Sequence, residues 1–400
     1  MVYILLLLYL LYLTIKYDVL GGKQYKMTHF YIVLIGLILI SGFRYRLGTD
    51  TYTYMSEFNY YPDLSLLKID EFSNWRYPPL WILLNSLART IGGFVLVQFF
   101  VSIIHIGLLG LVLKRLSPSL LFSSLLFYYL FDYTGFNMEV MREAISVSCF
   151  LMALLALDKG RIINVFLYIV IAFLFHIYSF LVFLLFLFYF KVLAKKPVLA
   201  VVSVICIAVV CIVEKNFFID LIVNCLVGTD TIYTDRIISY SQSPMFGETD
   251  FSWIGILVIF SLPVLYMSML FLTKKYYHRY ININPQIFNA AIYLSITFIL
   301  LKYSFIVIVR MCNYFDVFTF LLIGLFFKSI YVKIENFKQR ILAFVFLISI
   351  SIFCSYQKKN KKDDLVESEK KYSRYYPYSS IFDKTMDSKR EHIFFYKDNR

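Results

Sequence analysis

Repeated apolar runs constrain this 400-residue chain more than any other feature of its sequence. Runs of this length and composition are typical of helices that cross a lipid bilayer, where each backbone N–H and C=O must be satisfied within its own segment. Hydrophobic residues make up 60% of the chain and aromatic residues 20%, which is more than a soluble protein of this size tolerates. The sequence therefore predicts an all-α fold, a polytopic bundle of transmembrane helices.

Hydropathy and charge breaks together predict about 12 spans. Several are shorter than the ~20 residues of an upright membrane helix, so flanking aromatic residues must extend them. The predicted spans lie near residues 2–15, 28–43, 92–113, 119–131, 143–157, 162–175, 177–190, 198–213, 251–272, 287–309, 311–327 and 340–355. The first run lacks a basic start and a cleavage site, which favours a retained span. The less apolar segment 77–91 favours an interfacial or re-entrant helix.

Basic residues separate the two sides of the membrane. The positive-inside rule assigns the short lysine-rich loops to the cytoplasm. These loops contain Lys16, Lys23, Lys26, Lys114, Arg115, Lys159, Arg161, Lys191, Lys195, Lys196, Lys274, Lys275, Arg279, Lys328, Lys333, Lys338 and Arg340. We expect a transmembrane domain over residues 1–355, extracytoplasmic loops near 44–91 and 214–250, and a polar C-terminal tail over 356–400. The net charge of +13 then reflects membrane orientation and not nucleic-acid binding.

Cysteine and histidine usage predicts no disulfide, no metal site and no cofactor. Most of the cysteines lie in apolar runs, and no second histidine or cysteine stands at ligand spacing from His176.

The most informative polar residues are arginines on the face that the lysine-rich loops avoid. Arg44 and Arg46 follow the second predicted span, and guanidinium groups bind phosphate oxygens in pairs, so an anion on this face would explain them. Gly48 and Thr49 permit a tight turn that brings backbone N–H groups to the same anion. Asp50 could orient an arginine or accept a proton. Interfacial anchoring by arginine and tyrosine is the simpler alternative.

A second cluster opens the span near 143–157. Arg142 and Glu143 lie at or below the membrane interface, where ionisable groups usually face a bundle interior or a wet cavity. Glu139 is placed one helical turn before Glu143. A helix-end pair between Glu139 and Arg142 is the alternative interpretation.

Two further positions separate apolar runs. His176 has a neutral form that accepts a proton near neutral pH, which suits activation of a hydroxyl group, and a purely structural histidine is the alternative. Arg310 is expected at a hairpin turn on the outer face, followed by Tyr314. Asp316 lies in the next span, and a buried pair between Arg310 and Asp316 is the alternative there.

In this order the clusters resemble the EpsG family of exopolysaccharide polymerases, relatives of the Wzy-type O-antigen and capsule polymerases. The early Phe-Arg-Tyr…Gly-Thr-Asp…Tyr motif is matched by residues 43–45, 48–50 and Tyr54. The Arg-Gln-Ala-Ile pattern is matched by Arg142, Ala144 and Ile145, with Glu143 in place of glutamine.

The later motifs are matched in part. His176 corresponds to the family histidine, although Tyr178 and Ser179 follow where a Ser-Ala step is usual. Arg310, Tyr314 and Phe315 match the late Arg…Tyr-Phe pattern, and residues 375–382 are similar to family C-termini.

The resemblance implies a multi-pass protein of the bacterial inner (cytoplasmic) membrane with a GT-C-like polymerase architecture. It implies an enzyme that joins oligosaccharide repeat units carried on undecaprenyl pyrophosphate, working in membrane lipid beside chain-length regulator and flippase proteins. The residues expected to be catalytic are Arg142, Arg310, His176 and Asp50. Those expected to bind substrate are Arg44, Arg46, Gly48, Thr49, Tyr54, Glu143 and Tyr314.

Two other functions compete with this one. A lipid-linked oligosaccharide flippase or another transporter also needs cations for pyrophosphate, but deep in a central cavity and with repeat symmetry. An O-antigen ligase-like glycosyltransferase uses the same donor with a different acceptor. A structural scaffold leaves the outward arginines unexplained.

Overall fold

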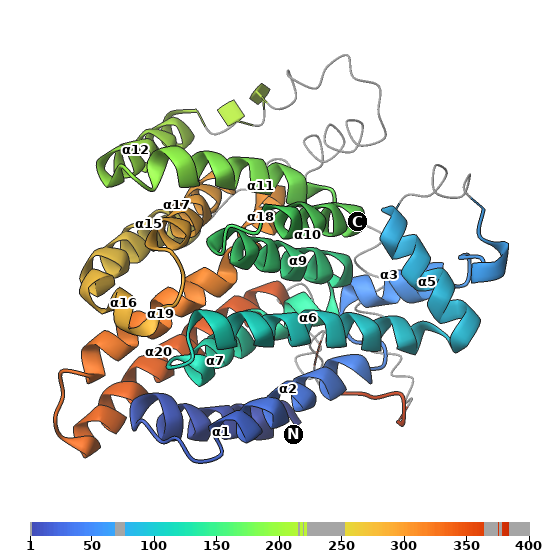
Figure 1. The fold of residues 1–400 in the computed structure, drawn as a ribbon, viewed down its shortest axis with the longest axis horizontal. Helices are drawn as coiled ribbons and strands as arrows, with labels where there is room; N and C mark the ends of the chain where they lie inside the picture. The colour runs from blue at the N-terminus through green and yellow to red at the C-terminus, as the bar shows by residue number, and fades with distance from the viewer. Residues whose placement is uncertain are drawn as a thin grey trace. The chain divides into compact units, whose positions relative to one another are not determined.

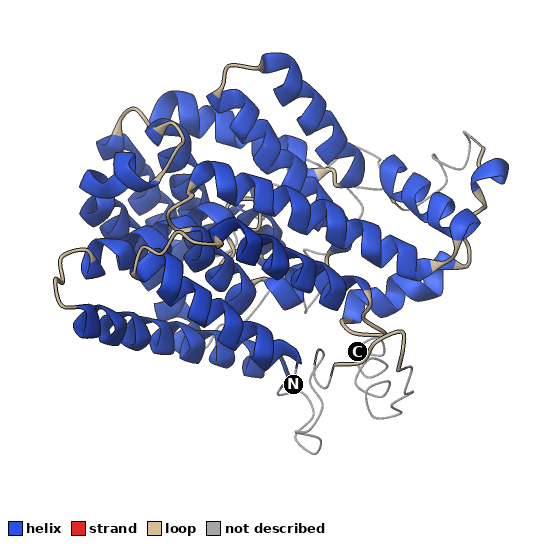
Figure 2. Ribbon diagram, turned by 60° about the horizontal axis from the view of Figure 1, so that its bottom comes forward, coloured by secondary structure: helices blue, strands red, loops and turns tan. Residues whose placement is uncertain are grey.

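The structure is a computed structural model, and it describes residues 2–68, 77–214, 217–218, 220–221, 253–363, 375 and 378–383. Its regular elements in these ranges are helices joined by short loops (Figure 2). The β-type pairs that it describes are isolated bridges, which Arg44 and Asp383 each make with Ser380. The all-α class is therefore confirmed.

A helix lies at each position where the sequence predicts a span (Figure 1). These helices are α1 (Val2–Leu13) with the π-helix η1 (Thr14–Val19), α2 (Lys26–Gly42), α6 (Phe94–Leu116), α7 (Leu121–Phe131), α9 (Met141–Asp158), α10 (Ile162–Phe175), α11 (Tyr178–Phe188) with η3 (Tyr189–Leu193), α12 (Pro197–Val213), α15 (Trp253–Thr273), α17 (Pro285–Leu301), α19 (Asp316–Tyr331) and α20 (Phe337–Asp363). Shorter elements are α3 (Thr49–Phe58), η2 (Leu64–Leu66), α5 (Pro79–Ile91), α8 (Tyr133–Met138), η4 (Lys274–Tyr276), α16 (Tyr277–Tyr280), η5 (Ile306–Ile308) and α18 (Val309–Cys312).

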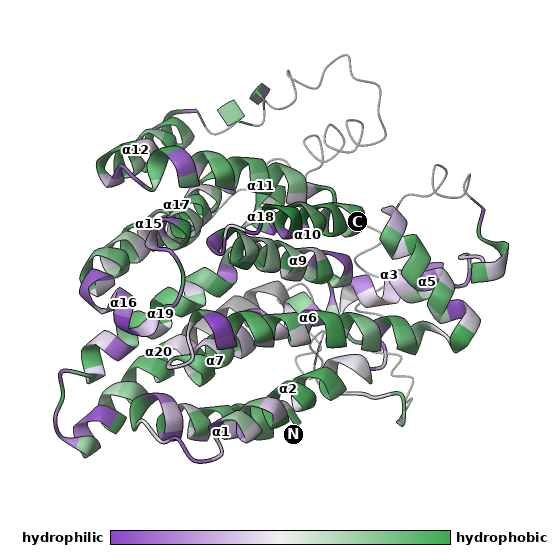
Figure 3. Cartoon of the chain, viewed as in Figure 1, coloured by the Kyte–Doolittle hydropathy of each residue, from purple (hydrophilic) through white to green (hydrophobic). Residues whose placement is uncertain are grey.

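By length and composition, two segments of the described chain could cross a membrane, Val2–Val19 and Phe94–Leu116. Several other apolar helices are shorter, at 10–17 residues. Hydrophobic residues line most of the helix lengths, while hydrophilic ones gather at helix ends and connections (Figure 3). On α10 the side chains of Ile163 and Phe166 are 77% and 68% exposed, an apolar outer face that suits contact with lipid.

Local sequence explains where several helices begin and end. Proline occupies the first turn of α5, α12 and α17, where its lack of an N–H costs nothing. The Asn284 side chain caps α17 by accepting a hydrogen bond from the Gln286 backbone N–H at 2.8 Å. Between α5 and α6, Gly93 has a φ of +101°, which allows the sharp change of direction.

Four expected details differ from the structure. The span near 287–309 ends earlier, because α17 stops at Leu301 where the polar residues 302–304 form a turn. Arg310 therefore lies on the one-turn helix α18 and not at a hairpin between two long helices. Glu139 precedes α9, so Glu139 and Glu143 are not one turn apart on one helix. The helix α20 continues past residue 355 to Asp363.

The chain forms two compact units. Unit 1 comprises Met1–Ser179 and Phe327–Arg400, and unit 2 comprises Phe180–Phe326. Expected features that lie outside the described residues are most of the 214–250 loop, residues 69–76 of the first loop and most of the tail.

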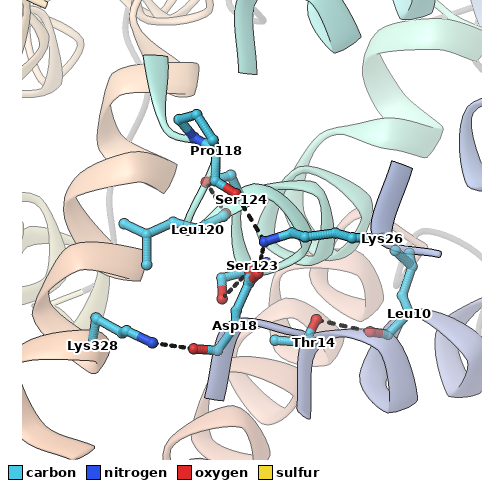
Figure 4. A network of polar contacts seen from close by, with 9 residues as sticks. All are labelled: Leu10, Thr14, Asp18, Lys26, Pro118, Leu120, Ser123, Ser124 and Lys328. Atoms are coloured by element: carbon cyan, nitrogen blue, oxygen red, sulfur yellow. Dashed lines mark hydrogen bonds and ion pairs between the residues drawn. The ribbon is translucent and has the colours of Figure 1, made fainter. Parts of the chain in front are cut away.

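One end of unit 1 gathers basic residues around a buried carboxylate (Figure 4). Asp18 Oδ1 lies 3.3 Å from Lys26 Nζ, and Oδ2 accepts hydrogen bonds from the Ser123 N–H at 2.7 Å and hydroxyl at 3.0 Å. Lys26 also donates to the Pro118 carbonyl at 2.8 Å, and Lys328 donates to the Asp18 carbonyl. These contacts tie η1, α2, α7 and the end of α19 together at the side where the sequence predicts cytoplasmic loops.

Residues 43–48, which connect α2 to α3 and contain Arg44 and Arg46, are called the arginine turn. This turn lies at the opposite end of unit 1. Helix α2 runs from Lys26 to Gly42, and α6 returns beside it, with a Ser41–Ser102 hydroxyl hydrogen bond of 2.8 Å between them. The Phe43 ring stacks on Phe99 with centroids 5.1 Å apart. The antiparallel course of α2 and α6 thus separates Arg44 from the basic end by a full helix length.

Candidate substrate site

Arg44 is buried, and it has no carboxylate partner among the described residues. Its side chain follows the end of α2 and is 1% exposed. Nη1 donates to the Ser41 carbonyl, and Nη2 donates to Thr51 Oγ1 at 3.2 Å and lies 3.1 Å from Met141 Sδ. Nε has no acceptor among the described residues. Burial lowers the pKa of Arg44 to about 10, which reflects the cost of a buried cation that no described acid compensates.

Gly48 brings the arginine turn against the segment before α9. Its φ is +90°, and a Cβ there would lie 2.5 Å from the Met138 carbonyl oxygen. Thr51 donates a hydrogen bond to the same carbonyl. Only glycine fits this close approach, so the tight turn predicted from Gly48 and Thr49 is present. The backbone of Thr49 begins α3, and its side chain lies outside what the structure describes.

Arg46 and Asp50 are placed at the same turn. The guanidinium of Arg46 lies 5.2 Å from the centroid of the Tyr52 ring, and its own backbone has a φ of +51°. Asp50 is partly buried in the first turn of α3, where an acid stabilises the helix N-terminus. Their predicted roles toward substrate stay predictions.

A short C-terminal segment, residues 378–383, packs on the arginine turn. The Tyr45 N–H donates to the Ser379 carbonyl and the Ile381 N–H donates to the Phe43 carbonyl, both at 3.0 Å. The Ser379 hydroxyl donates to the Tyr45 carbonyl at 2.7 Å. Tyr378 donates to the Ile40 carbonyl at 3.0 Å, more than 300 residues away in sequence. This segment therefore braces the backbone on both sides of Arg44.

Arg142, on the first turn of α9, is close to Arg44 through their shared neighbour Met141. Arg142 is partly buried, and its Nε donates to the Tyr54 hydroxyl at 3.1 Å. Its guanidinium carbon lies 4.4 Å from the centroid of Tyr77 and 5.6 Å from that of Tyr54. Neither Nη atom has a hydrogen-bond acceptor among the described residues. These two atoms form the planar fork that matches phosphate oxygens in pairs.

Aromatic residues from α3, from α5 and from the segment just before α5 lie around this guanidinium. The Tyr54 ring lies 5.1 Å from Trp81 and 6.2 Å from Tyr77, and Tyr61 belongs to the same buried cluster. Tyr77 donates a hydrogen bond to Glu57 Oε2. The sequence predicted Tyr54, but it gave no role to Glu57, Tyr61, Tyr77 or Trp81. The three-residue spacing of Tyr54 and Glu57 on one helix was the available signal.

Glu143 and His176 lie near the same end of unit 1. Glu143 is 2% exposed in the first turn of α9. His176 follows the last residue of α10, is 6% exposed, and has its ring 5.1 Å from Tyr178. Ser146 on α9 donates to the Ala172 carbonyl at 2.8 Å, and Ala172 and Met141 belong to one buried cluster. The end of α10 is thus joined to the start of α9.

A buried histidine that the sequence analysis passed over supports this region. His105 on α6 has Nδ1 2.9 Å from the Ala144 carbonyl and Nε2 2.9 Å from the Tyr128 hydroxyl. Asn137 also donates to Tyr128. The pattern fits an imidazole protonated on Nδ1. The network links α6, α7, α8 and α9. The sequence did not predict this network, because it shows His105 only as a lone histidine in an apolar run.

The remaining predicted residues belong to unit 2. Arg310 is partly buried on α18, and Tyr314 is fully buried. The Phe315 ring lies 6.2 Å from both Phe186 and Phe298. Within unit 1 the structure thus brings Arg44, Gly48, Tyr54 and Arg142 together, while Arg310 and Tyr314 are held by the core of unit 2.

Among the described residues, no group of three or more His, Cys, Asp or Glu side chains could hold a metal ion.

Comparison with known proteins identifies the family. No curated protein and no solved structure matches the chain. Residues 27–380 match the EpsG family, a range that runs from the start of α2 to Ser380 on the bracing segment. The chain therefore belongs to the EpsG family and is a membrane-associated protein of polysaccharide biosynthesis.

Proposed function

We propose that this protein is a glycosyltransferase that polymerises oligosaccharide repeat units carried on undecaprenyl pyrophosphate, at the extracytoplasmic face of the bacterial inner membrane. The family supports polysaccharide polymerisation. The single observation that carries the site is the Arg142 guanidinium, stacked on Tyr77 with neither Nη atom bonded to a described residue. A guanidinium group positioned by these contacts at the start of α9 suits interaction with an anionic leaving group.

The proposed chemistry requires stabilisation of the departing pyrophosphate. Negative charge grows on phosphate oxygens as the glycosidic bond breaks, and fixed guanidinium donors stabilise the transition state more than the ground state. We assign Arg142 to the pyrophosphate directly and Arg44 to a supporting electrostatic role, because Arg44 is buried behind Met141. The catalytic role predicted for Arg310 stays a prediction. Tyr54 holds Arg142 in place through its hydroxyl.

We further propose that all twelve predicted segments cross the membrane in a GT-C-like arrangement. A helix of 17 residues, such as α2, is about 25 Å long, which approaches the ~30 Å hydrocarbon core. Lipid contact also explains why α1, α10 and α12 expose large apolar side chains. The end of unit 1 that gathers Lys26 and Lys328 is then cytoplasmic, and the Arg44 and Arg142 end faces outward.

Substitution of Arg142 tests the proposed function. In the native host we expect Arg142→Ala to reduce polymerisation about 10²–10³-fold, because one donor to the developing charge is lost. Polymer length on gels and polymer yield at matched protein level are the measurements. Arg142→Lys should restore little, because an ammonium lacks the paired fork. Arg89→Ala is the matched control, since Arg89 is engaged by Asp63 at 3.3 Å.

The same experiment separates the competing functions. A polymerase defect leaves single repeat units on the outer leaflet, whereas a flippase defect leaves them on the inner leaflet. Normal polymer ladders from Arg142→Ala at normal protein level would contradict the assignment of Arg142. Inner-leaflet accumulation would instead favour the transporter.

A further inference from the structure

Tyr77 lies between two opposite charges in unit 1. Its ring packs on the Arg142 guanidinium at 4.4 Å, and its hydroxyl donates a hydrogen bond to Glu57 Oε2. Glu57 and Tyr54 are one turn apart on the same face of α3, and Tyr54 accepts the hydrogen bond from Arg142 Nε. Two tyrosines from separate segments therefore connect the carboxylate of Glu57 to the cation of Arg142.

The two charges do not neutralise each other. Neither Glu57 nor Arg142 forms an ion pair with any described residue, although both are partly buried in an aromatic cluster. Opposite charges in such surroundings usually pair directly, because leaving either one uncompensated costs free energy. Here the ring of Tyr77 occupies the place of a direct contact. A ligand with a phosphate for Arg142 and a hydroxyl for Glu57 would satisfy both groups.

Both charges lie next to the Tyr77 side chain, Glu57 at its hydroxyl group and Arg142 at its ring. Burial raises the pKa of Tyr77, the Glu57 carboxylate raises it further, and Arg142 opposes this increase. Burial likewise raises the pKa of Tyr61, and the same two charges act on it in opposite directions. The carboxylate of Glu57 and the guanidinium of Arg142 are therefore separated by the Tyr77 side chain.

We infer that Glu57 is the general base that accepts the proton of the attacking sugar hydroxyl, an inference that rests on the proposed function. The hydroxyl oxygen of the acceptor unit bonds to the anomeric carbon of the donor. The bond from that carbon to the pyrophosphate oxygen breaks, and its electron pair remains on the pyrophosphate at Arg142. The hydroxyl proton passes to the Glu57 carboxylate and then to water.

Glu57 is favoured over Asp50 and His176, the bases expected from sequence, by this chain of contacts. Tyr77 links Glu57 directly to the group assigned to the leaving pyrophosphate. A base for the attacking hydroxyl must lie within reach of the same anomeric carbon as the leaving group, because both bonds change at that carbon.

The test uses purified full-length protein and the lipid-linked repeat unit extracted from a host strain that lacks this protein. We expect Glu57→Gln to lower kcat about 10²–10⁴-fold while the Kd for this donor stays at the wild-type value. Arg142→Ala should instead weaken donor binding as well as turnover. Asp63→Asn is the matched control, because Asp63 is an acid shortly after α3 that forms an ion pair with Arg89. This variant should retain wild-type kcat.

Two further variants keep the inference open to contradiction. Glu57→Asp retains a carboxylate, so it should recover part of the lost kcat even if Glu57→Gln folds poorly. Tyr77→Phe keeps the ring over Arg142 and should lower kcat by less than Glu57→Gln. Wild-type kcat in Glu57→Gln, or a loss of donor binding equal to that of Arg142→Ala, would overturn the inference and leave the proposed function standing. Failure of the wild-type protein to polymerise this donor would overturn the proposed function itself.

Discussion

At the scale of single residues, Arg44 and Arg142 have different surroundings and therefore different roles. Arg44 is 1% exposed and bonded to backbone, hydroxyl and sulfur atoms, so it cannot reach a large substrate directly. Arg142 donates to Tyr54 through Nε and stacks on Tyr77, and its Nη atoms have no acceptor among the described residues.

Gly48 is the residue on which the Arg44 turn depends. Gly48→Ala forces a Cβ within 2.5 Å of the Met138 carbonyl oxygen at a φ of +90°, so we expect a loss of about 1–3 kcal/mol in stability and weaker polymerisation. Thermal unfolding of the purified protein and polymer yield are the measurements.

Gly93→Ala is the control for this substitution. Gly93 has a similar φ of +101° but no atom within 4 Å of the added Cβ, so only the backbone strain remains. Equal losses of stability from the two alanine substitutions would show that the contact with Met138 does not matter.

At the scale of elements, the bracing segment 378–383 and the arginine turn form one substructure. Backbone hydrogen bonds on both sides of Arg44, together with the ring contact of Phe43 and Phe382 at 5.4 Å, fix the path of the turn. Helix propensity explains none of these contacts, because they join residues from opposite ends of the chain. The match to the EpsG family extends to residue 380, so it includes part of this segment.

Neighbouring serines on this segment provide a matched comparison. The Ser379 hydroxyl donates to the Tyr45 carbonyl at 2.7 Å, whereas the Ser380 side chain has no such bond to the described turn. We expect Ser379→Ala to cost about 0.5–1.5 kcal/mol and to lower polymer yield, and Ser380→Ala to change neither. In an Arg44→Ala background the effect of Ser379→Ala on activity should disappear, since both act through one site. Full additivity of the two losses would contradict the positioning role.

At the scale of the whole molecule, opposite ends of unit 1 differ in charge partners. One end ties lysines to the buried carboxylate of Asp18 (Figure 4). The other end holds Arg44 and Arg142, neither of which forms an ion pair with a described residue. Helices α2 and α6 run in opposite directions between these two ends, as consecutive membrane spans are expected to do. Unit 2 is built separately around α17, with Tyr189 and Thr297 hydrogen-bonded at 2.8 Å in its interior.

Cysteine labelling tests this orientation. In a background without native cysteines, Asn59→Cys at the arginine end should react with a membrane-impermeant thiol reagent applied to intact cells. Lys159→Cys, in the loop after α9, should react only after permeabilisation; both positions are exposed in the structure. The reverse pattern would contradict the positive-inside assignment.

The sequence by itself determined the helical class, the approximate places of the helices and the presence of a turn after Arg44. Those features depend on local hydropathy, on proline and glycine at helix boundaries, and on the backbone freedom of Gly48. It misplaced the end of α17, because apolar composition continues through residues 305–309 after the helix has stopped.

Only the tertiary structure decided that Tyr77 stands between Glu57 and Arg142 and that Ser379 braces Tyr45. Nothing in local pattern encodes these contacts, which join residues from 20 to 334 positions apart. They arise when apolar faces pack and the remaining polar groups must find partners within the resulting space.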